Sequence, residues 1–154
     1  IDAEPTALQQ MLDVFSEVNG PVLLVERVPR SDVSRYGIIA AEPVRDGVLR
    51  VTDLVEKPDS NKAPSEFAVI GRYILTPDIF EALEQTQVGA GGEIQLTDAL
   101  RTMLSVRPIH ACVLQGTRLD AGTKLGYVKA VLHFALKRPE LGHELKVFIK
   151  QLLG

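Results

Sequence analysis

IIAAEPVRDGVLRVTDLV, residues 38–55, is the part of the sequence from which the fold is most readily inferred. Two runs rich in apolar residues, 38–44 and 48–55, flank the dipeptide Asp46-Gly47. Asp-Gly favours the positive φ angles of a two-residue turn, and between such runs it is a strong short-range signal for a β-hairpin. The stretch therefore predicts two neighbouring antiparallel strands.

Strand and helix patterns alternate on both sides of this hairpin. Residues 21–28 form a near-continuous apolar run, which is typical of a strand covered on both faces. The alternation predicts one α/β domain over residues 1–154 with a mixed sheet, rather than a helical bundle or a β-sandwich. Further strands are expected at 67–75 and 108–114, and helices at 8–18, from Thr76-Pro77, at 96–104, from Thr123 and from Pro139.

The composition excludes several classes of function. The formal net charge is −3, which argues against general binding to nucleic acid. No apolar run approaches the roughly 20 residues that a membrane-spanning helix needs, and no signal peptide is expected at Ile1. Cys112 is the single cysteine, and in its apolar run it is interpreted as a buried thiol rather than a nucleophile. One unpaired cysteine suits the cytoplasm.

Glu56-Lys57-Pro58 is the first group of residues that can carry chemistry. Pro58 ends an apolar strand, so the two charged side chains are expected at a strand terminus, where α/β sheets bind ligands. A carboxylate can accept hydrogen bonds from sugar hydroxyls, and an ammonium can meet a phosphate. A solvated charge pair is the alternative. Tyr36-Gly37 begins the preceding strand, where the glycine permits close approach of a ligand or merely relieves a turn.

Asp120-Ala121-Gly122 lies between a predicted strand and the start of a helix. A carboxylate there suits Mg²⁺, and the amides that follow favour an anion, although Asp120 can equally cap a turn. The loop Gly89-Ala90-Gly91-Gly92 lacks the spacing of a phosphate-binding motif and is expected to supply flexibility and a helix start. Glu93 and Asp98 follow it, with Glu93 favourable at a helix start and Asp98 more typical of a solvated charge.

In this order, the clusters resemble the second half of the bacterial UTP–glucose-1-phosphate uridylyltransferase family, over nearly the whole chain. Glu-Lys-Pro occurs across many sugar nucleotidyltransferases, whereas the Glu-Ile-Gln-Leu-Thr-Asp-Ala run and the Lys-Leu-Gly-Tyr ending are more specific to the uridylyl branch. The matching segments are Val33-Ser34-Arg35-Tyr36-Gly37, Val55-Glu56-Lys57-Pro58, Ile70-Gly71-Arg72-Tyr73, Gly92-Glu93-Ile94-Gln95-Leu96-Thr97-Asp98 and Asp120-Ala121-Gly122-Thr123-Lys124-Leu125-Gly126-Tyr127.

The resemblance implies a nucleotide-diphospho-sugar transferase fold with a doubly wound, mostly parallel sheet. It implies the reaction of UTP with glucose 1-phosphate to give UDP-glucose and pyrophosphate, with Mg²⁺ as cofactor, in a cytoplasmic dimer or tetramer. Glu56 would bind glucose hydroxyls, and Lys57 would bind the phosphate as a catalytic residue. Tyr36-Gly37 would close over the sugar.

The resemblance also implies which residue binds the metal ion. Asp120 would be a catalytic residue and the second Mg²⁺ ligand, converging with Glu56 and Lys57 on one hexose phosphate. Gly122 would be a substrate-binding position, and Glu93 and Asp98 would line or brace the site. After the aspartate the family has cysteine or a similar residue and then Gly-Asn, where this chain has Ala121-Gly122-Thr123; the carboxylate and the glycine remain.

The beginning of the chain departs from the family. The family begins with a strand and a glycine-rich loop that cradle the UTP phosphates, and its first Mg²⁺ aspartate also lies upstream of Ile1, whereas this sequence opens with a helix pattern. The expectation is a carboxy-terminal portion that is inactive alone. Two alternatives stay open: a thymidylyl or cytidylyl relative, and a module without catalysis whose residues 141–152 serve self-association.

Overall fold

The computed structural model describes residues 1–89 and 92–154. Residues 90 and 91, in the predicted glycine-rich loop, lie outside the described residues. Contacts divide the chain into two compact units, a sheet unit of residues 3–115 and a helical unit of residues 1–2 and 116–154. The sheet unit contains α1 (Ala7–Val18), β1 (Val22–Arg27), the 3₁₀ helix η1 (Arg30–Arg35), β2 (Gly37–Arg45), β3 (Val48–Glu56), β4 (Phe67–Ile74), α2 (Ile79–Gln85), α3 (Leu96–Met103) and β5 (His110–Val113).

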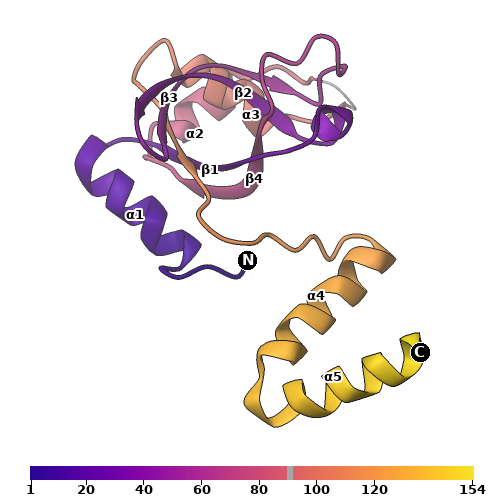
Figure 1. Cartoon of the computed structure of the whole chain (residues 1–154). Helices are drawn as coiled ribbons and strands as arrows, with labels where there is room; N and C mark the ends of the chain where they lie inside the picture. The colour runs from indigo at the N-terminus through magenta and orange to yellow at the C-terminus, as the bar shows by residue number, and fades with distance from the viewer. Residues whose placement is uncertain (90–91) are drawn as a thin grey trace. The chain divides into compact units, whose positions relative to one another are not determined.

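The five strands of the sheet unit form a ring of hydrogen-bonded neighbours in the order β1-β4-β2-β3-β5, closed by β5 on β1 (Figure 1). β1 and β5 are parallel, and the other described pairings are antiparallel. The predicted mixed sheet is confirmed. The described pairings are mostly antiparallel, not mostly parallel as the resemblance implied. For β2 and β3 the cause is local, because a tight turn joins them and enforces antiparallel pairing.

The core of the sheet unit lies on both faces of β1. Val22, Leu23, Leu24 and Val25 are all fully buried, which confirms the prediction of a strand covered on both sides. α1 contacts β1 on one face. Leu23 and Val25 belong to the cluster that α2 and α3 complete on the other face. The helix α3 is thereby fixed against the end of the sheet that carries the predicted site residues.

Three of the predicted helices are preceded by a threonine that could cap them, and two of these threonines have the capping geometry. The hydroxyl of Thr6 accepts a hydrogen bond from the amide of Gln9 at 3.3 Å, and that of Thr123 accepts from Gly126 at 3.0 Å. The start predicted at Thr76 is wrong. α2 begins at Ile79, and the Thr76 hydroxyl bonds to the Asp78 carboxylate instead of an amide of the first turn.

The helical unit consists of α4 (Lys124–Lys137) and α5 (Pro139–Leu153), with the first two residues of the chain. Asp2 forms ion pairs with His133 and Lys137 of α4, and these partners hold the pKa of Asp2 below its usual value. The connection between the helices is tight, because a Cβ on Gly142 would lie 2.5 Å from the carbonyl oxygen of Leu136. In the described part of the chain, no helix has the length and apolarity needed to cross a membrane.

Candidate functional site

Glu56 is the last residue of β3, and its carboxylate is held from two sides. The Thr97 hydroxyl, from the first turn of α3, donates to Glu56 Oε2 at 2.6 Å. The ammonium of Lys57 lies 3.6 Å from Glu56 Oε1. The Glu56 side chain is 19% exposed and that of Lys57 is 61% exposed. The pair therefore combines a fixed, largely buried acceptor with a cation that reaches into solvent.

Gly37 lies directly opposite Glu56 in the β2–β3 ladder. A Cβ at residue 37 would lie 3.1 Å from Glu56 Oε2 and 3.2 Å from the Thr97 hydroxyl. Those contacts are tighter than side chains normally tolerate, so a glycine here lets the carboxylate and the hydroxyl meet. The carbonyl of Tyr36 accepts a hydrogen bond from the amide of Lys57 at 2.9 Å. The fold thus brings Tyr36, Gly37, Glu56 and Lys57 together; their binding roles stay predictions.

Lys57 adopts a backbone conformation that is unusual for a residue with a side chain. Its φ is 44°, in the left-handed region, which costs roughly 1–2 kcal/mol for a residue other than glycine. Backbone strain of this kind is concentrated at ligand-binding positions, where the surrounding structure enforces it. The conformation is held by the Lys57–Tyr36 hydrogen bond on one side and by Pro58 on the other.

This strain predicts an inverted response to glycine. We expect Lys57→Gly to have a free energy of unfolding about 0.5–1 kcal/mol higher than Lys57→Ala, because both remove the ammonium but only glycine adopts the positive φ without strain. Urea denaturation of the two variants measures the difference. Glu84, exposed on α2, is the matched control. There, Glu84→Gly should be less stable than Glu84→Ala, because glycine is unfavourable inside a helix. Greater stability of alanine at residue 57 would contradict the strained conformation.

Glu93 and Asp98 lie at the start of α3, next to the glycine-rich loop. The carbonyl of Glu93 accepts from the amide of Gly89 at 2.9 Å. A Cβ on Gly89 would lie 2.8 Å from Asp98 Oδ2, so this carboxylate packs against the loop backbone. These contacts place Gly89 against the start of the helix that carries Thr97. The bracing roles of Glu93 and Asp98 stay predictions.

Two residues at this site were not singled out from the sequence. Thr97 lies within the Glu-Ile-Gln-Leu-Thr-Asp run, which was the available signal, but its role requires knowing that α3 packs at the end of β3. Tyr73 lies on β4, within the Ile-Gly-Arg-Tyr segment. Burial raises the pKa of the Tyr73 phenol, and the negative charge of Glu56 raises it further. The Tyr73 phenol is thus close enough to Glu56 for the charge of the carboxylate to act on it.

Asp120 belongs to the helical unit and begins the turn that leads into α4. Its Oδ1 accepts a hydrogen bond from the amide of Gly122 at 2.9 Å, and its Oδ2 lies 3.7 Å from Arg118 Nη1. Its side chain is 41% exposed. The turn-capping role that the sequence left open is thus observed, and it fixes the carboxylate while leaving part of it accessible.

A Mg²⁺ ion would find in Asp120 one suitable ligand. Across residues 1–89 and 92–154, no group of three or more histidine, cysteine, aspartate or glutamate side chains could hold a metal ion. Mg²⁺ is commonly bound through one or two carboxylates together with substrate phosphates and water. The Asp120 carboxylate, oriented by the Gly122 amide, fits such a shared coordination and does not form a complete metal site by itself.

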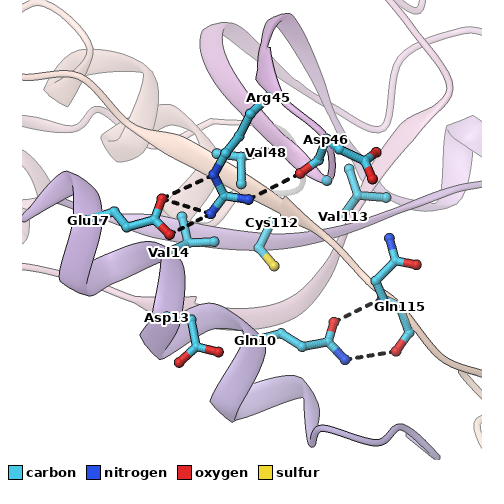
Figure 2. Close-up of a pocket in the computed structure, with 11 residues that line it drawn as sticks. Gln10, Asp13, Val14, Glu17, Arg45, Asp46, Val48, Cys112, Val113 and Gln115 are labelled. Atoms are coloured by element: carbon cyan, nitrogen blue, oxygen red, sulfur yellow. Dashed lines mark hydrogen bonds and ion pairs between the residues drawn. The ribbon is translucent and has the colours of Figure 1, made fainter.

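A hollow of the sheet unit, apart from Glu56, lies between α1, the β2–β3 turn and β5 (Figure 2). Arg45 forms a forked ion pair with Glu17 across it, with nitrogen–oxygen distances of 2.8–3.1 Å. The side-chain amide of Gln10 accepts a hydrogen bond from the backbone N–H of Gln115 at 2.9 Å and donates one to its carbonyl at 2.8 Å. Cys112 lies in this hollow and is 5% exposed, which confirms the predicted buried thiol. Burial raises its pKa, so the reactive thiolate is disfavoured.

Comparison with known proteins identifies the class. The nucleotidyl transferase family model matches residues 2–136, and the chain belongs to that family. Within it, the chain is 45% identical over 152 residues to the UTP–glucose-1-phosphate uridylyltransferase of Staphylococcus epidermidis, covering 99% of this chain and 53% of the relative. A solved UDP-glucose pyrophosphorylase complexed with UDP-glucose matches with a TM-score of 0.85 at 43% identity, over 90% of this chain and 53% of that one.

The UTP-bound UGPase of Acinetobacter baumannii is a further similar structure, with a TM-score of 0.81 at 39% identity, over 94% of this chain and 50% of that one. These matches confirm the resemblance to bacterial UTP–glucose-1-phosphate uridylyltransferases and the α/β fold with a mixed sheet. The chain spans about half the length of the curated relatives that it matches.

Proposed function

We propose that this chain forms the sugar-phosphate-binding part of a UTP–glucose-1-phosphate uridylyltransferase. The observation that carries the proposal is the Glu56 carboxylate, which is largely buried at a strand end, bonded to Thr97 and next to the exposed Lys57 ammonium. A fixed carboxylate beside an exposed cation is the combination that vicinal hydroxyls and a phosphate on one small molecule require. The uridylyltransferase name of the Staphylococcus epidermidis relative supports this substrate and favours it over a thymidylyl one.

The proposed reaction is the transfer of a uridylyl group from UTP to glucose 1-phosphate. A phosphate oxygen of glucose 1-phosphate attacks the α-phosphorus of UTP, the bond to the β-phosphate breaks, and pyrophosphate leaves. The attacking phosphate is already ionised at neutral pH, because its second pKa is about 6, so no general base is required. Positioning and charge compensation are therefore the tasks left to the side chains.

Each candidate residue has a task in this scheme. Glu56 accepts hydrogen bonds from the glucose hydroxyls, and the backbone at Tyr36-Gly37 lies against the same carboxylate, where the sugar would pack. Lys57 offsets the negative charge of the glucose 1-phosphate group. Asp120 would hold Mg²⁺ in this scheme, and the ion would supply charge compensation on the phosphates.

Three further positions support the reaction in the proposal. The Gly122 amide orients the Asp120 carboxylate. Asp98 and Glu93 brace the loop at Gly89. We also propose that the protein works as a homo-oligomer, as the family resemblance implied.

Binding of glucose 1-phosphate to the 154-residue chain tests the proposal. We expect Glu56→Ala to weaken binding about thirtyfold, because about 2 kcal/mol is the scale of hydrogen bonds to a charged group. NMR titration measures both dissociation constants. Glu84→Ala removes an exposed carboxylate from α2 of the same unit and should leave binding unchanged. Equal affinity of the Glu56→Ala and Glu84→Ala variants would show that the proposed site is wrong.

The helical unit supports one alternative, a self-association module without catalysis. Apolar side chains of α4 and α5 line a groove of about 410 Å³, among them Val131, Leu141 and Phe148. Phe148 is 56% exposed. The same titration separates the two functions: no binding of glucose 1-phosphate, together with dimerisation that depends on concentration in sedimentation, would favour the alternative.

A further inference from the structure

Thr97 is the residue that the structure connects directly to the proposed sugar-binding carboxylate. Its hydroxyl has one proton to donate, and that proton is directed at Glu56 Oε2 over 2.6 Å. Hydrogen bonds to a charged acceptor are short and strong, so this contact restrains the rotation of the carboxylate. Gly37 closes the same oxygen from the β2 side, since even a Cβ there would lie within 3.1 Å of it.

The two oxygens of Glu56 therefore have different surroundings. Oε2 is engaged by Thr97 and packed against Gly37. Oε1 lies on the side of Lys57, 3.6 Å from its ammonium, and the Lys57 side chain is exposed. A ligand that meets the ammonium with its phosphate would thus meet Oε1 with its hydroxyls.

The helix that carries Thr97 is itself fixed on β3. One turn further along α3, Arg101 forms an ion pair with Asp53, with its Nε 2.6 Å from Oδ1 and its Nη2 3.1 Å from Oδ2. Ala99 and Leu100 are buried in the core between these two attachments. The Thr97 hydroxyl is consequently held by a rigid element rather than by a loop, which is the arrangement that supports a precisely oriented binding group.

We propose that Thr97 is a positioning residue, which orients Glu56 so that one carboxylate oxygen faces the hydroxyls of the hexose. This inference rests on the proposed function. It assigns to α3 a share in selecting a sugar phosphate over a bare phosphate, because inorganic phosphate can engage Lys57 without the oriented carboxylate.

The test compares Thr97→Val with Thr97→Ser in the 154-residue chain. Valine keeps the branched shape and removes the hydroxyl, whereas serine retains the donor. Dissociation constants are measured by NMR titration with two probes, glucose 1-phosphate and inorganic phosphate. We expect Thr97→Val to weaken the binding of glucose 1-phosphate about tenfold and the binding of inorganic phosphate less than about twofold. For Thr97→Ser, both dissociation constants should stay within about threefold of those of the unchanged chain.

The outcomes separate positioning from a general structural effect. The inference is overturned if Thr97→Val binds glucose 1-phosphate with normal affinity. It is also overturned if Thr97→Val weakens the binding of both probes equally and Thr97→Ser does not restore it. Glu56→Ala, titrated in parallel, distinguishes the two levels. If Glu56→Ala weakens the binding of glucose 1-phosphate and Thr97→Val does not, the inference alone is wrong. If Glu56→Ala leaves this binding unchanged, the proposed function is wrong, and the inference is wrong with it.

Discussion

The 154-residue chain by itself is expected to form no UDP-glucose from UTP and glucose 1-phosphate, even with Mg²⁺ present. The curated relatives that it matches are about twice as long, since the chain covers 53% of the Staphylococcus epidermidis enzyme. Holding a second reactant in line contributes about 7–11 kcal/mol to a reaction of this type, which corresponds to roughly 10⁵- to 10⁸-fold in rate. Lys57 can offset charge on one phosphate, but charge compensation alone does not align two substrates.

A coupled assay for UDP-glucose measures this, with a full-length uridylyltransferase as the positive control. Host enzyme carried through purification is the main source of a false signal, and Glu56→Ala in the 154-residue chain identifies it. Product formation that persists unchanged in Glu56→Ala comes from the contaminant. Product formation that Glu56→Ala removes would contradict the expectation and show that these residues contain a complete active site.

The parts of the fold that could be predicted from the sequence are those specified by local chemistry. Asp46-Gly47 between two apolar runs predicted the β2–β3 hairpin, which the ladder confirms. The Thr123 hydroxyl and Pro139 predicted the starts of α4 and α5. Closure of the sheet could not be predicted in this way, because the closing pair, β5 with β1, joins segments far apart in the chain. Nothing in either strand specifies such a partner.

The same distinction applies to the site. Glu56 and Lys57 could be selected because Pro58 marks the strand end and the tripeptide is part of a known pattern. Thr97 and Tyr73 could not be given roles, since their relation to Glu56 arises only when α3 and β4 are packed in the folded sheet unit. The strained φ of Lys57 was also not predicted, because a lysine gives no local signal for a left-handed conformation.

Replacing Gly126 with alanine is expected to disrupt the turn from Asp120 into α4 and to destabilise the helical unit. A Cβ at residue 126 would lie 1.8 Å from the carbonyl oxygen of Asp120 and 2.9 Å from the Thr123 hydroxyl that caps the helix. The first of these neighbours is backbone, so the clash can be relieved only by moving the turn. Glycine to alanine inside a helix ordinarily stabilises by about 1 kcal/mol. At residue 126 we expect the opposite sign, a loss of about 3 kcal/mol from the helical unit.

Hydrogen exchange at the amides of α4 measures this loss, because it reports the stability of the helical unit separately from that of the sheet unit. Lys129→Ala, at an exposed position of the same helix, is the matched control and should leave exchange nearly unchanged. The amide of Gly122, which donates to the Asp120 carboxylate, should shift in the NMR spectrum of Gly126→Ala alone. Slower exchange in Gly126→Ala, together with an unshifted Gly122 amide signal, would contradict this prediction. The position of the Asp120 carboxylate would then not depend on Gly126.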